Sequence, residues 1–95
     1  MSDKKIIIKL EKEFDYLDSK VNEIRAAAEA LGGEALEKIS KELDRIKGQI
    51  ETVKKDFDAA KAAAPGNWEE LRNSLQERID QIKDLFKSFK DRLEQ

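Results

Sequence analysis

The chain has 95 residues, of which 42% are charged and 39% apolar; with one proline and four glycines, this is the composition of a single domain of long, exposed helices. Its 19 basic and 21 acidic residues are mixed along the sequence and give a net charge of −2, so no basic field is available to bind nucleic acid. Without cysteine or histidine, the chain lacks disulfides, thiolate metal sites, the commonest general base and the commonest transition-metal ligand.

The first helix is expected over residues 3–31, with Ser2 or Asp3 placed to cap its N-terminus by accepting backbone N–H bonds. Its apolar residues recur at alternating steps of three and four, the spacing of core positions in a coiled coil. They are Ile7, Leu10, Phe14, Leu17, Val21, Ile24, Ala28 and Leu31. Ile6 and Ile8 lie beside this stripe and widen it at its start.

A turn at Gly32-Gly33 is expected to end this helix, because glycine adopts left-handed conformations without a steric penalty. The second helix, over residues 34–64, has the most regular stripe of the chain and needs partners along its whole length. Its apolar positions are Leu36, Ile39, Leu43, Ile46, Ile50, Val53, Phe57, Ala60 and Ala64. A turn over residues 65–67 follows, because Pro65 disfavours helix at the preceding residue and Gly66 supplies a bend.

The third helix is expected over residues 68–94, with Asn67 as its N-cap and Glu70 three residues later, as in a capping box. Its apolar positions are Trp68, Leu71, Leu75, Ile79, Ile82, Phe86, Phe89 and Leu93. Two successive steps of four lead through Leu75 to Ile79, which predicts a stutter in the repeat. Strict heptads would instead place Arg78 in the core.

These patterns predict an all-α fold, an antiparallel up-down-up three-helix bundle that forms one domain over residues 1–95. The links between helices are two or three residues long, and links that short force consecutive helices to lie antiparallel. This threading also sets the alanine-rich ends of the first two helices level with large side chains, as close packing requires.

No catalytic constellation is expected. The carboxylate pairs Glu11/Asp15 and Asp80/Asp84 fall on the solvated side of their helices, whereas general acid–base catalysis needs groups that are buried or placed in a pocket. The sequence has no glycine-rich phosphate loop, nucleophile elbow or calcium-binding loop. We therefore predict a protein that is not an enzyme and that holds no cofactor or metal.

Two regions are candidates for interaction. Residues 82–90 carry an apolar face flanked by three lysines, namely Lys83, Lys87 and Lys90. This face is expected either to fill the core, to lie in a membrane interface, or to contact a second copy of the chain. Trp68 either packs at the end of the bundle or anchors a partner. The candidate interaction face is thus Ile82, Leu85, Phe86, Phe89 and Trp68.

Gly48 lies at the outermost position of the second helix, where glycine costs about 1 kcal/mol relative to alanine. It is explained either by neutral drift or by a hinge or a close approach of another chain. No apolar run reaches the length of a membrane span, and the Ile6–Ile8 run is too short for a signal peptide. A cytoplasmic protein is expected.

The third helix also resembles a known group. Its Trp68-Glu69-Glu70-Leu71 start, followed by Leu75, Ile79, Ile82-Lys83-Asp84 and Phe86, resembles the C-terminal helix of small bacterial coiled-coil proteins, often labelled stress-response or uncharacterised proteins. The chain departs from them in having Ile79 where they have a second tryptophan and Leu85 where they have a small residue. The resemblance implies no enzymatic activity and a cytosolic, stress-linked role in binding or scaffolding.

The first hypothesis for function is therefore a non-enzymatic structural or interaction bundle that binds itself or another helical protein. The second is a lipid- or granule-surface protein that opens at its turns and lays amphipathic helices on the interface. A third is an engineered bundle without a biological function, which the regular stripes favour and Gly48 argues against.

Overall fold

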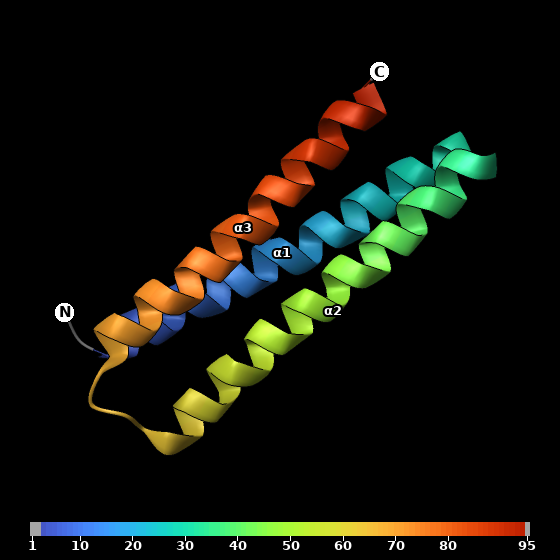
Figure 1. The fold of residues 1–95 in the computed structure, drawn as a ribbon. Coiled ribbons are helices and arrows are strands. Elements are labelled where there is room, and N and C mark those ends of the chain that lie inside the picture. The colour runs from blue at the N-terminus through green and yellow to red at the C-terminus, as the bar shows by residue number, and fades with distance from the viewer. Residues whose placement is uncertain (1–2, 95) are drawn as a thin grey trace.

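The computed structural model describes residues 3–94, with the side chains of residues 3–92. Over this part of the chain there are three helices, α1 (Asp3–Leu31), α2 (Gly33–Ala63) and α3 (Trp68–Glu94), and each packs against the other two. Figure 1 shows that α2 runs antiparallel to α1 and α3, which share a direction. The predicted up-down-up three-helix bundle is confirmed, and it forms a rod of 49 × 19 × 16 Å.

The core is built from residues of the three predicted stripes, together with Ile6 of α1. Its larger members are Leu10, Phe14, Leu17, Val21 and Ile24 from α1, Leu43, Ile46, Ile50, Val53 and Phe57 from α2, and Trp68, Leu75, Ile79, Ile82, Phe86 and Phe89 from α3. None of the polar or charged side chains within residues 3–92 is buried. The stutter in α3 is present, because Ile79 is fully buried and Arg78 lies at the edge of the core. The suggested cap at Ser2 and the packing of Leu93 lie outside the described residues and side chains.

The stripe of α1 departs from its prediction at the N-terminal end. Ile6 is the core residue there, only 1% exposed, whereas Ile7 is partly buried and Ile8 is 45% exposed. The steps from Ile6 to Leu10 and on to Phe14 are both four residues. The expected strict repeat was wrong here because a helix of 3.6 residues per turn drifts away from a 3.5-residue repeat. A second step of four residues turns the apolar stripe of α1 back towards the core.

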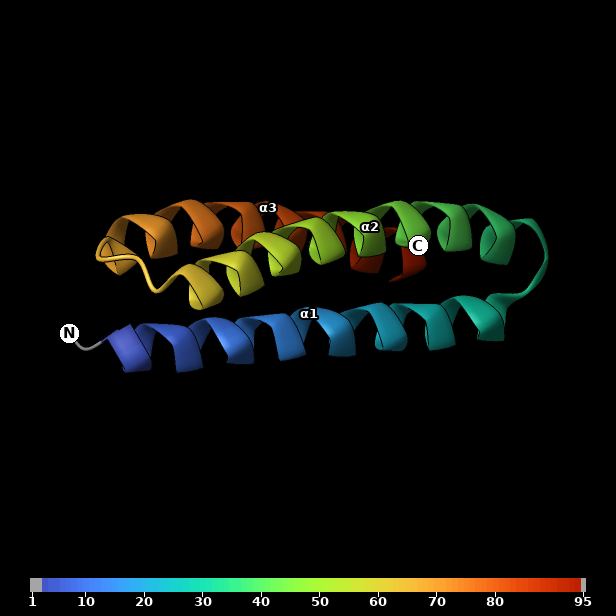
Figure 2. The same ribbon diagram turned by 90° about the horizontal axis from the view of Figure 1, so that it is seen from below.

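The opposite end of the bundle is less covered than predicted. Figure 2 shows α3 ending short of the turn between α1 and α2. α3 has 27 residues and α2 has 31. Leu31 is therefore 56% exposed rather than in the core, and Leu36 and Ile39 are only partly buried. The tip of the α1–α2 hairpin is a two-helix structure.

The link between α1 and α2 is a single residue, Gly32. Its N–H donates to the carbonyl of Ala28 at 3.1 Å, and its carbonyl accepts from the N–H of Leu36 at 3.3 Å. This one residue therefore caps both the C-terminus of α1 and the N-terminus of α2. Gly32 and Gly33 have φ angles of +68° and +61°, which a side chain would strain. Because Gly33 is already helical, α2 begins one residue earlier than expected.

The link between α2 and α3 contains a strained alanine. Ala64 adopts the left-handed conformation, with φ 48° and ψ 54°, and its N–H donates to the carbonyl of Ala60 at 3.1 Å. The helix therefore ends at Ala63, one residue earlier than expected. In this turn the left-handed residue is Ala64 rather than Gly66.

Ala64→Gly is expected to raise the free energy of unfolding by about 0.5–1 kcal/mol. An L-residue in the left-handed conformation costs roughly 1–2 kcal/mol, and the greater freedom of glycine in the unfolded chain offsets part of that gain. Urea unfolding followed by circular dichroism measures the difference. The matched control is Ala62→Gly, inside α2, which is expected to lower the same quantity by about 1 kcal/mol. Destabilisation by both changes would contradict strain at Ala64.

Candidate interaction surface

Two rows of side chains line the edge along which α2 meets α3. Each row has one residue at every seventh position, which keeps it on one side of its helix. The rows are Glu42, Gln49 and Asp56 on α2, and Arg92, Leu85 and Arg78 on α3. Because the two helices are antiparallel, Glu42 faces Arg92, Gln49 faces Leu85 and Asp56 faces Arg78.

Ion pairs close both ends of this edge. Arg92 binds Glu42 with two bonds, Nη1 to Oε1 at 3.1 Å and Nη2 to Oε2 at 2.6 Å. The hydrogen bond from Arg92 lowers the pKa of the Glu42 carboxyl, and the same bond raises the pKa of the Arg92 guanidinium. At the other end, Arg78 Nη1 lies 2.7 Å from Asp56 Oδ2. All four side chains are partly exposed, so these pairs add little stability but align the two helices.

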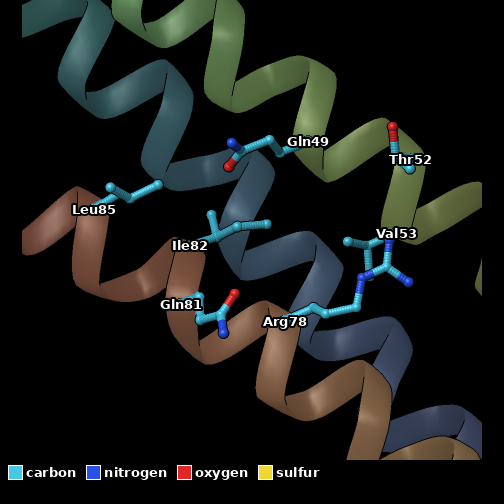
Figure 3. A pocket seen from close by; sticks show the side chains of 7 residues that line it. All are labelled: Gln49, Thr52, Val53, Arg78, Gln81, Ile82 and Leu85. Carbon is cyan, nitrogen blue, oxygen red and sulfur yellow. The ribbon is translucent and has the colours of Figure 1, made fainter.

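Between the two ion pairs the edge opens into a groove of about 430 Å³. Figure 3 shows α1 behind the groove, with α2 and α3 forming its walls. Its lining residues are Gln49, Thr52 and Val53 from α2 and Arg78, Gln81, Ile82 and Leu85 from α3. Leu85, halfway along α3, is 41% exposed and is the large apolar side chain that this groove leaves accessible.

Gly48 lies beside this groove, one turn before Thr52 on α2, and the Thr52 hydroxyl donates to its carbonyl at 3.0 Å. A side-chain carbon built on Gly48 would meet no atom within 4 Å, and its φ is not in the left-handed region. The single chain therefore has no steric need for glycine at this position. We call the set Gly48, Gln49, Thr52, Gln81 and Leu85 the uncharged window.

A second groove, of about 520 Å³, lies between α1 and α3. It is lined by Tyr16, Lys20, Glu23, Ile24 and Ala27 from α1 and by Lys83, Asp84, Phe86, Lys87 and Lys90 from α3. The half-exposed ring of Tyr16 lies under two ammonium groups, with Lys20 Nζ 5.6 Å and Lys83 Nζ 5.2 Å from its centroid. We call this the basic groove.

The five residues proposed from the sequence as an interaction face differ in their burial. Ile82, Phe86, Phe89 and Trp68 are buried in the core, while Leu85 is accessible. Trp68 packs edge-on against Phe57, with ring centroids 6.4 Å apart. Use of the buried four in a membrane interface would require the bundle to open.

Sequence reasoning did not find the rows that close the α2–α3 edge or the contribution of α1 to the basic groove. The seven-residue spacing of the rows is visible in the sequence. It becomes informative only when the facing edges of α2 and α3 are known. Tyr16 and Lys20 carried no signal of their own, because isolated surface residues of these types are common on helices.

The carboxylates considered for chemistry are exposed. Glu11, Asp15, Asp80 and Asp84 all lie at the surface, and Asp80 accepts a bond from the amide of Gln76 at 3.0 Å. Within the described residues no group of three or more acidic side chains is placed to hold a metal ion. None of the helices in residues 3–94 has the length and apolar character needed to cross a membrane.

Comparison with known proteins found no matching family model, curated protein or solved structure. The resemblance of the third helix to small bacterial coiled-coil stress proteins therefore stays a prediction.

Proposed function

We propose that this protein is a non-enzymatic structural bundle, located in the cytoplasm, that acts by self-association through the uncharged window. The observation that carries the proposal is the exposed Leu85 at the centre of an uncharged stretch, between two ion pairs, on a chain that is 42% charged. Gly48 supports it, because a missing side chain lets another backbone approach α2 closely.

The charges along the α2–α3 edge favour a second copy as the partner. A twofold axis parallel to the helices brings α2 of one copy against α3 of the other at the same height. Glu42 of each copy then lies close to Arg92 of both copies, and Asp56 close to Arg78 of both. Opposite charges alternate at each end, and the uncharged window fills the centre.

The other twofold arrangement is less favourable. With an axis across the helices at the middle of the window, α2 would face α2 of the second copy in antiparallel orientation. Arg45 would then lie opposite Lys55 of the other copy, and like charges at a contact cost free energy. The parallel axis is therefore the arrangement we propose.

The contact is expected to be weak and reversible. The edge from Glu42 to Asp56 covers about 20 Å of helix at 1.5 Å per residue, which is under half the length of the bundle. Interfaces smaller than the standard size belong to transient associations. Association is therefore expected only at high protein concentration.

Leu85→Glu is expected to abolish self-association. In the proposed dimer the two Leu85 side chains lie near the axis, so the change replaces an apolar contact by two neighbouring carboxylates. Sedimentation equilibrium at about 10 μM to 1 mM protein measures this. The mass of the unaltered chain should rise from 10.9 kDa towards twice that value, and that of the variant should stay at 10.9 kDa.

The matched control is Leu31→Glu, which introduces the same charge at a more exposed leucine outside the window. It should keep the concentration dependence of the unaltered chain, and circular dichroism checks that both variants fold. A constant mass of 10.9 kDa for the unaltered chain would refute the proposal. Equal loss of association in both variants would place the contact elsewhere, and measurable enzymatic turnover would refute the non-enzymatic part.

A further inference from the structure

The basic groove combines an apolar floor with a charged rim. Ile24, Ala27 and Phe86 supply apolar lining from both walls. The volume of about 520 Å³ falls within the range of small-molecule sites in proteins. Ile24 and Phe86 are nearly covered by their neighbours, so a thin chain entering the groove reaches them and a flat surface does not.

The rim has an excess of positive charge. Four lysines line the groove, and two carboxylates, Glu23 and Asp84, line it with them. The local excess is two positive charges on a chain whose net charge is −2. The four lysines are Lys20, Lys83, Lys87 and Lys90.

The excess arises from a break in the pairing between α1 and α3. Glu13 on α1 binds Lys83 on α3, with Oε2 and Nζ 2.5 Å apart. Seven residues further along each helix, the corresponding positions are Lys20 and Lys90, which carry like charges. Lys20 binds Glu23 of its own helix at 3.1 Å. Lys90 has no ion-pair partner among the described side chains.

Lys87 lies one turn before Lys90 on the side of α3 that lines the groove, and the described side chains offer it no ion-pair partner either. Two neighbouring ammonium groups without acidic partners, above an apolar floor, match a ligand with one anionic end and one apolar end. Without such a ligand, the neighbouring positive charges of Lys87 and Lys90 repel each other and lower the stability of the bundle.

We propose that the basic groove binds a single-chain anionic amphiphile of the fatty-acid type. Lys87 and Lys90 hold the anionic head, and the alkyl chain lies along Ile24, Ala27 and Phe86. The site goes beyond the proposed self-association, since it uses the edge of α3 opposite to Leu85.

The test is isothermal titration calorimetry with dodecanoate below its micelle concentration, with dodecan-1-ol as the uncharged analogue. Dodecanoate is expected to bind and dodecan-1-ol to bind at least tenfold more weakly. The double variant Lys87→Gln/Lys90→Gln should bind dodecanoate about five- to tenfold more weakly, as expected for the loss of two exposed charge contacts. The matched control is Lys38→Gln/Lys55→Gln on α2, which removes the same charge outside the groove and should leave binding unchanged.

A variant that strengthens binding makes the test sharper. Asp84 is the acidic residue of the rim that has no ion-pair partner among the described residues, and it repels an anionic head. Asp84→Asn should therefore bind dodecanoate about twofold more tightly. Leu85→Glu, which tests self-association, should bind dodecanoate as the unaltered chain does, so the two proposals fail independently.

Three results would overturn the inference. The first is equal binding of dodecanoate and dodecan-1-ol, which would show that the lysines do not select the ligand. The second is unchanged affinity in Lys87→Gln/Lys90→Gln. The third is binding to phosphatidylglycerol vesicles without binding of dodecanoate, which would assign the lysines to a membrane surface rather than to a single-chain ligand.

Discussion

Phe57→Ala is expected to lower the free energy of unfolding by about 3–5 kcal/mol, the usual range for deleting a buried aromatic ring. Phe57 is buried on α2, its ring centroid lies 5.2 Å from that of Phe14 on α1, and it also packs against Trp68 on α3. The ring therefore joins all three helices where the chain turns from α2 to α3. Since small domains have about 5–15 kcal/mol in total, this change removes a large fraction of the stability.

Urea unfolding followed by circular dichroism measures the effect. The control is Leu31→Ala at the uncovered tip of the hairpin, which should change the free energy of unfolding by less than about 1 kcal/mol because little apolar area is lost. Trp68 fluorescence gives a second readout, because its ring packs on Phe57 and should become more exposed in the variant. Similar free-energy losses in the two variants would contradict the position of Phe57 in the core.

Ile79→Ala is expected to cost about 2–4 kcal/mol, because Ile79 is fully buried and its removal leaves a cavity. The comparison with Arg78→Ala tests the stutter in α3. Arg78 is partly exposed and paired with Asp56 at the surface, so its replacement should cost no more than about 1 kcal/mol.

Chemical denaturation of both variants under the same conditions decides between the two repeats. A strict heptad repeat would place residue 78 rather than 79 in the core. If the arginine variant lost more stability than the isoleucine variant, the packing of α3 described above would be wrong. The slope of free energy against urea should be the same in both, since the surface exposed on unfolding is nearly unchanged.

The helices and their mutual direction follow from the sequence, because apolar periodicity and short glycine- and proline-containing links act locally. The stutter at Ile79 could be predicted for the same reason, since the alternative would bury an arginine. Which side chains are buried at the two ends of the bundle could not be predicted equally well. Whether Ile6 or Ile7 is covered depends on the drift of α1 over several turns, and the exposure of Leu31 depends on where α3 stops.

Part of the interaction surface was visible in the sequence. Gly48 stood out because glycine is costly inside a helix, and Leu85 because it lies beside the stripe. The pairing of Glu42 with Arg92 could not be derived. The sequence leaves open on which side of the α1–α2 hairpin α3 packs. That choice decides whether the side of α2 with Gln49 or the side with Lys47 meets α3.

Among residues 3–92 every side chain of the core is apolar, so few positions in this bundle are tied to one particular partner. A buried polar residue must keep its partner, so it restrains what both positions can become. Apolar core residues restrain one another mainly through total volume, and cores accept many simultaneous apolar exchanges when volume and pattern are kept. Related bundles of this kind can therefore diverge until they share periodicity and link lengths but few identical residues.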